Sequence, residues 1–328
     1  MSIGQIHEAV ITALRGASEK VTNRRNAVAA LHKGLKKFTE KSWPLLRSRD
    51  VWFSTTQRNT IAARGQVCVQ THGIDVGHLS VDPTNNAYMF HPNDQCLIET
   101  NISGNGKTGW AWSKNPGDGK KIRKFIEECK KLTKAKENSE REIQWILADA
   151  LKAPGKPEVL ERMKPVTWNG RFVEIGVSIN KKGNPGTGNI DLLVIRRGGN
   201  QGSRFLVFEL KNPGDTNVKA ALDQAIQYAT ALSVEANDGG KENQKLYNRV
   251  FDSNGVGKLV IGAVVVLEDC AKVRSDAPAI LKAYWDNRGA SKIDRLGLLL
   301  YKKEGLRYTW SWLDGWDARQ NMTNSGKV

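Results

Sequence analysis

The sequence predicts an α/β protein with a mixed sheet in its second half and an α+β region before it. Two observations carry this prediction. Segments of helical and strand periodicity alternate in the second half, in the order helix, three strands, helix, strand. A helix between two strands favours their parallel pairing, so the last strand is expected to join in parallel and make the sheet mixed.

The first half combines basic helices with short strands. Residues 1–50 carry apolar side chains at helical spacing, and residues 51–113 are rich in Thr, Val, Gly and Asn with short alternating runs. Residues 119–136 return to a basic amphipathic helix. We therefore place a boundary near residue 137. A basic α+β domain for recognition or regulation would span 1–136, and a second domain would span 137–328.

The elements of the second half follow from periodicity and turn residues. The first is a helix over 139–153 with Ser139 as its N-cap. Gly-, Pro- and Asn-rich turns separate three strands, which are 171–179, 190–195 and 204–211. A helix over 217–236 and a buried, β-branched strand over 258–267 complete the order. A further helix (277–287) and two strands (296–302 and 306–312) follow.

Composition narrows the class of protein. The chain has 328 residues, 39% of them hydrophobic, which suits a globular protein of about two domains. Its four cysteines form no CxxC pair, which excludes a zinc ribbon and favours a reducing, cytoplasmic setting. The longest strongly apolar run, 259–267, is too short to span a bilayer, so we expect a soluble protein without a membrane partner.

The net charge of +16 predicts a polyanionic partner. An anionic membrane surface, or a basic surface that is simply solvated, would fit the charge as well. The motifs below favour nucleic acid among these readings.

Three charged residues on two strands form the chemical centre of the sequence. Side chains alternate along a strand, so Glu209 and Lys211 point to the same face. Asp191 opens the preceding strand and can meet them if the two strands pair. Two carboxylates offer oxygen ligands to Mg²⁺, and a lysine beside them can orient water or stabilise developing charge. Charged residues that are merely solvated at strand ends are the alternative interpretation.

The stretch FELKNPGDTNVKAALDQAIQYA adds a second pattern, in which Gln224 and Tyr228 lie four residues apart on the helix after Lys211. Together with the order of elements in 139–267, it resembles the PD-(D/E)xK nucleases, in particular RecB-like members with a QxxxY motif. It is also similar to the nuclease domain of type I restriction motor subunits and to Shedu-type antiphage nucleases. Ile190 stands where the motif has proline, a position that varies in the superfamily.

The resemblance implies a Mg²⁺- or Mn²⁺-dependent nuclease that hydrolyses DNA, in restriction or antiphage defence or in repair or recombination. Asp191 and Glu209 would hold the metal, and Lys211 would act on water or charge. Gln224 and Tyr228 would support the site or contact the DNA backbone. Self-association is also expected. A DNA-binding or regulatory protein that keeps the fold without cutting is the alternative, and an RNA substrate stays open.

A further acidic residue is expected from the first helix. Glu140 lies nearer than Glu142 to the apolar stripe of that helix, so it is better placed to reach the end of the sheet. The string SEREIQ is also similar to the start of Shedu-like cores. Glu140 is therefore chosen over Glu142, and Glu174 on the first strand is a third candidate.

Three other sequence patterns are weaker evidence of function. The loop at Gly106 lacks the earlier glycine of a phosphate-binding loop, because position 101 is Asn. The histidines and cysteines between residues 68 and 96 match no familiar zinc spacing. Trp310, Trp312 and Trp316 could stack on bases, but their spacing is more typical of strand packing.

Overall fold

The protein is described from a computed structural model. It covers residues 2–39, 52–54, 67–71, 73–82, 87–104, 106–107, 109–111, 116–132, 139–152, 164–165, 172–197, 203–250, 260–288, 293–305 and 307–317. The α/β class and the mixed sheet predicted from the sequence are confirmed.

Six strands of the second half form the mixed sheet: β6 (Phe172–Ile179), β7 (Pro185–Arg197), β8 (Ser203–Leu210), β9 (Val260–Glu268), β10 (Ile293–Glu304) and β11 (Arg307–Asp317). They lie side by side in chain order. β6, β7 and β8 are antiparallel, as are β10 and β11. β8 and β9 pair in parallel, as the intervening helix predicted, and so do β9 and β10. The two-residue strand β5 (Lys164–Pro165) also pairs with β7.

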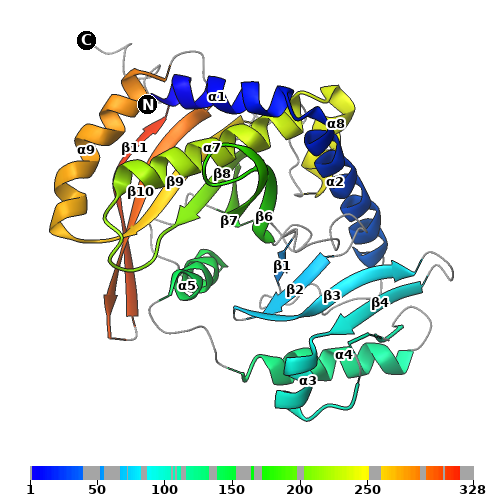
Figure 1. The fold of residues 1–328 in the computed structure, drawn as a ribbon. Coiled ribbons are helices and arrows are strands. Elements are labelled where there is room, and N and C mark those ends of the chain that lie inside the picture. Colours follow the sequence, from blue (N-terminus) through cyan, green and yellow to red (C-terminus); the bar gives the residue numbers. More distant parts are fainter. Residues whose placement is uncertain are drawn as a thin grey trace.

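A second group of strands extends this sheet through the short strand β1 (Trp52–Ser54), which pairs in parallel with β6 and antiparallel with β2 (Val67–Thr71). β3 (Ile74–Asp82) and β4 (Ala87–Pro92) continue it in antiparallel order. Helices α3 (Asp94–Thr100) and α4 (Pro116–Cys129) lie beside these strands (Figure 1). An aromatic group at this end, Phe90, Trp110 and Phe125, is buried between α4 and the strands.

Alternating side chains give the mixed sheet two apolar faces. On one face Leu193 and Val207 belong to the core that contains α7 (Val218–Asn237). On the other face Leu192 and Phe208 pack in a second core with α5 (Glu140–Lys152). Figure 1 shows α7 and α9 (Ala271–Asp286) on one side of the sheet and α5 on the opposite side.

The first two helices pack against the second half of the chain. α1 (Ile3–Arg15) begins with a capping box at Ser2 and lies along α7, and α2 (Ser18–Thr39) lies against α8 (Gly240–Val250). The apolar face of α1, including Ile3 and Val10, is part of the core that covers the mixed sheet. These helices therefore share a core with residues beyond the boundary expected near 137.

Several elements differ in length from the sequence prediction. β7 begins at Pro185 instead of 190, because the turn before it is tighter than its many Gly and Asn residues indicated. α9 begins at Ala271 instead of 277, and Pro278 lies inside it. Helices α3 and α8 and strand β5 were not expected. The helix expected over 119–136 is α4, which ends at Cys129.

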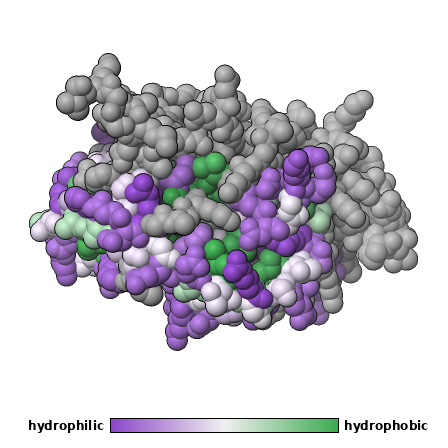
Figure 2. Space-filling model, turned by 90° about the horizontal axis from the view of Figure 1, so that it is seen from above, coloured by the Kyte–Doolittle hydropathy of each residue, from purple (hydrophilic) through white to green (hydrophobic). Residues whose placement is uncertain are grey.

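The surface is mainly hydrophilic where Figure 2 shows described residues, and its apolar patches there are small and separate. None of the helices in the described ranges is both long enough and apolar enough to cross a bilayer.

Candidate active site

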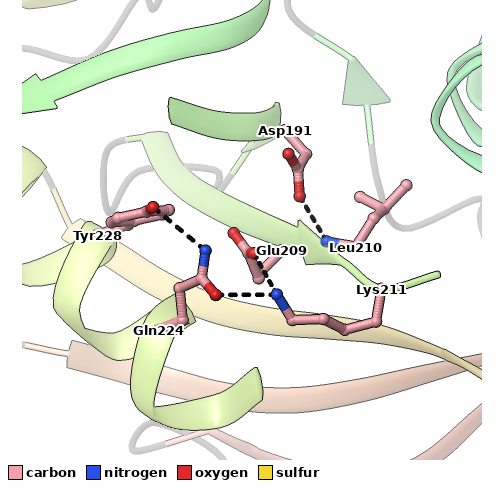
Figure 3. A network of polar contacts seen from close by, with 6 residues as sticks. All are labelled: Asp191, Glu209, Leu210, Lys211, Gln224 and Tyr228. Atoms are coloured by element: carbon pink, nitrogen blue, oxygen red, sulfur yellow. Dashed lines mark hydrogen bonds and ion pairs between the residues drawn. The ribbon is translucent and has the colours of Figure 1, made fainter. Parts of the chain in front are cut away.

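Asp191, Glu209 and Lys211 come together at one end of the mixed sheet. Strands β7 and β8 pair with Leu192 opposite Phe208, so the next position on each strand brings Asp191 beside Glu209. Both carboxylates point toward the α7 face, as the period-two alternation predicted. Figure 3 shows Lys211 and Gln224 completing the group, with Gln224 supplied by α7.

A chain of short polar contacts links these side chains. The ammonium Nζ of Lys211 lies 2.6 Å from Oε1 of Glu209 and 2.9 Å from Oε1 of Gln224. The amide nitrogen of Gln224 lies 3.2 Å from the hydroxyl of Tyr228. Asp191 accepts a hydrogen bond of 2.6 Å from the backbone N–H of Leu210, which ties β7 to β8 at this point. The helix face that carries Gln224 and Tyr228 is thus joined to the end of β8.

Tyr228 lies against a position that requires glycine. A Cβ atom at Gly188 of β7 would come within 2.6 Å of the Tyr228 ring and within 2.2 Å of the backbone oxygen of Ile179. The absence of a side chain at Gly188 therefore gives the ring its place next to the sheet. The Tyr228 ring is buried.

Burial and neighbouring carboxylates disfavour the charged forms of Asp191 and Glu209. Burial raises the pKa of Asp191 well above its ordinary value, and the charge of Glu209 adds to the effect. Burial likewise raises the pKa of Glu209 to about 7, although Lys211 opposes the shift. Burial alone would lower the pKa of Lys211, but the neighbouring Glu209 and Asp191 hold it above its ordinary value. Both carboxyl groups therefore hold their protons to a higher pH than ordinary ones, because one lysine offsets burial and repulsion only in part.

One oxygen of Glu209 is left over. Glu209 is 3% exposed, and its Oε2 atom is buried and meets no hydrogen-bond donor among the described residues. An unsatisfied carboxylate oxygen beside a second carboxylate fits a divalent cation, which would satisfy the oxygen and relieve the repulsion. Among the described residues, no group of three or more His, Cys, Asp or Glu side chains lies together as metal ligands.

The acidic candidates of the first helix occupy different surroundings. Ser139 caps α5, accepting a hydrogen bond from the N–H of Glu142. Glu140 lies close enough for its carboxylate to raise the pKa values of both Asp191 and Glu209. Glu142 points elsewhere and forms an ion pair of 3.2 Å with Lys303 of β10. Glu174 belongs to β6, but its side chain lies outside the described part of the structure.

Two residues at this site were not among the candidates predicted from the sequence, although Gln144 ends the string SEREIQ. Gln144 of α5 donates to the backbone oxygen of Asp191, and Asn212 accepts from the N–H of Glu140. Both side chains hold backbone near the carboxylates. The contacts of both residues depend on the three-dimensional arrangement, since their partners lie in other segments of the chain.

The structure accounts for the described histidines and tryptophans that the sequence offered as weaker candidates for a metal site or for base stacking. Both ring nitrogens of His91 are in contact with protein oxygens, those of Ser80 and Gly106, and His91 stacks on His78. Trp310 is buried in the core beside Tyr301, and Trp312 lies against Arg295. His72 and Thr108, and the side chain of Trp316, lie outside the described part of the structure.

Comparisons of the chain with protein-family models, with curated proteins and with solved structures found no match.

Proposed function

We propose that this protein is a metal-dependent nuclease of the PD-(D/E)xK type that hydrolyses DNA phosphodiester bonds. One observation carries the proposal. Asp191 and Glu209 lie side by side at the end of the sheet, next to Lys211, and Glu209 keeps a buried oxygen without a donor in the described structure. Buried carboxylate charges such as these destabilise the folded protein unless a ligand compensates them.

Asp191 and Glu209 would bind Mg²⁺ or Mn²⁺ through the oxygens that protein donors leave available. Such an ion stabilises charge on a phosphoryl group and makes bound water more acidic. Lys211 is kept protonated by its carboxylate neighbours. It is therefore better suited to stabilise negative charge on the phosphate, or to orient water, than to take up a proton.

Gln224 and Tyr228 would position Lys211. The Gln224 carbonyl accepts from the ammonium group, and its amide contacts the Tyr228 hydroxyl, so the orientation of the amide is set by both partners. Glu140 would add a carboxylate from α5 at the edge of the site.

DNA as the substrate is supported by the net charge of +16 and by the resemblance carried by the motif residues. Restriction or antiphage defence is the setting we propose, since the local similarity of 208–229 is to nucleases of such systems.

Substitution at the site tests the proposal. Lys211→Ala and Asp191→Ala are expected to lower the rate of DNA cleavage by about 1000-fold, because each removes charge stabilisation or a metal ligand. Their affinity for DNA should stay close to that of the wild type. Their melting temperatures should fall but both should fold, because Asp191 accepts from the Leu210 N–H and Lys211 pairs with the buried Glu209. Lys245→Ala is the matched control, since Lys245 is an exposed lysine on α8 that pairs with Glu242. Normal cleavage by either site variant would overturn the assignment.

A further inference from the structure

Helix α5 touches the candidate active site with one face and the strands of the first half with another. Successive residues of a helix are about 100° apart, so Glu140 and Gln144 share one face while Arg141 and Trp145 share the next. The first pair faces the end of β7 and β8. The second pair faces the turn between β2 and β3.

The contacts of the first face hold the backbone around the carboxylates. Gln144 is 4% exposed, and its side-chain amide donates to the backbone oxygen of Asp191. The N–H of Glu140 donates to the side-chain oxygen of Asn212, which follows Lys211. A shift of α5 would therefore move the Glu140 carboxylate and disturb the strand end that carries Asp191.

The contacts of the second face leave little room at the β2–β3 turn. Gly73 has φ +76°, and a Cβ atom there would lie 2.5 Å from Cδ1 of the Trp145 ring. The ring itself is 5% exposed, so it has few directions in which to yield. Beside it, Arg141 reaches Asp75 of β3 across 3.4 Å, with both side chains about one-third exposed. The ion pair is weak at such exposure, so the packing of Trp145 on Gly73 dominates.

We infer that Trp145 is a positioning residue through which the β2–β3 turn sets the place of Glu140 relative to Asp191 and Glu209. The inference rests on the proposed nuclease function. The strands of the first half would then be part of the catalytic scaffold, and any ligand that moves this turn would change the rate of cleavage.

Gly73→Ala tests the inference because its methyl group would displace the Trp145 ring, while position 73 itself lies outside the candidate active site. A misplacement of about 1 Å costs about 100-fold in rate. We expect kcat for DNA cleavage to fall by about that factor, while KM for DNA stays within about twofold. Mn²⁺ binding to the protein alone, measured by calorimetry, should weaken by about tenfold, the lower range for the loss of supporting contacts around a metal.

A matched control separates this push from backbone strain. Gly240 has φ +78°, close to that of Gly73, but a Cβ atom there would meet nothing within 4 Å. Gly240→Ala should therefore carry the same conformational cost and leave both kcat and Mn²⁺ affinity unchanged. The melting temperature of Gly73→Ala should fall more than that of Gly240→Ala, because its methyl group also meets the Trp145 ring.

A double-mutant cycle identifies Trp145 as the route. In a Trp145→Leu background the smaller side chain leaves room for the new methyl group, so Gly73→Ala should cost no further kcat. The inference is overturned if Gly73→Ala behaves like Gly240→Ala in both readouts, or if its effect on kcat persists in full in the Trp145→Leu background. If the wild type itself neither binds Mn²⁺ nor cuts DNA, the proposed function has failed as well.

Discussion

Helix α7 connects two buried carboxylates whose surroundings differ. Near its start, Gln224 accepts from Lys211, the ion-pair partner of Glu209. Glu209 has one oxygen on Lys211 and one without a donor in the described structure. Near its end, Glu235 is fully buried, and its oxygens contact the backbone N–H of Ser178 at 2.6 Å and the Tyr247 hydroxyl at 3.5 Å.

The charges around the two carboxylates differ in sign. Glu235 lies near Arg24 and Arg25 of α2, and both arginines oppose the effect of burial on its pKa. Glu209 lies near a second carboxylate, and only Lys211 opposes the effect. Burial still raises the pKa of Glu235, but protein cations and hydrogen bonds compensate its charge in part, whereas Glu209 keeps an oxygen that a ligand could bind. The comparison separates a charge that holds the structure together from one that is suited to chemistry.

Removal of each carboxylate should affect stability very differently. Glu235→Ala removes the charge that offsets those of Arg24 and Arg25 and leaves the Ser178 N–H without its acceptor, so we expect a loss of about 3–5 kcal/mol in the free energy of unfolding. Glu209→Ala should cost no more than about 1 kcal/mol in metal-free protein at pH 8, because it also removes an unfavourable charge. Urea unfolding of both variants measures this. Equal losses would remove the distinction between the two carboxylates.

The stability of the metal-free protein should depend on pH through Glu209. Its pKa rises from 4.5 in the unfolded chain to about 7 in the folded protein. The contribution of the Glu209 carboxyl group to the free energy of unfolding is therefore fully present below pH 4.5 and is lost as the pH rises through 7. That loss amounts to at most about 3 kcal/mol. Glu209→Gln should therefore be more stable than the wild type at pH 8 and not at pH 5, as measured by urea unfolding at each pH.

Binding of divalent cations should depend on pH through the same carboxyl groups. Mg²⁺ should raise the melting temperature of the wild type more at pH 8 than at pH 5, since it competes with protons for the carboxylates. The same cation should have little effect on Glu209→Gln. An equal rise at both pH values would argue against binding at this pair.

The smallest effect on DNA cleavage is expected from substitution of Gln224. Gln224→Ala removes the amide that orients the ammonium of Lys211 but leaves all charged groups in place. Cleavage should fall by about 10-fold in kcat, with KM for DNA unchanged, because the amide acts through Lys211. Steady-state kinetics would check this. A larger loss than that of Lys211→Ala would mean that Gln224 acts on the substrate directly.

The order of elements around the site could be predicted because each strand and helix has its own periodicity. Alternation along β8 placed Glu209 and Lys211 on one face, and the helix between β8 and β9 predicted their parallel pairing. The placement of the β2–β3 turn on Trp145 could not be predicted, because it depends on contacts between residues far apart in the chain. The same holds for Gln144 and for the packing of α1 on α7.

The most direct test of the central claim is cleavage of circular and linear DNA, as duplex and as single strand, by the purified wild type. We predict cutting with Mg²⁺ or Mn²⁺ and none with a chelator, with activity restored when the metal is returned. Cutting of the circular substrates would show that no DNA end is needed. Binding of DNA without cutting, under all of these conditions, would contradict the claim and favour a DNA-binding protein built on the same arrangement of strands.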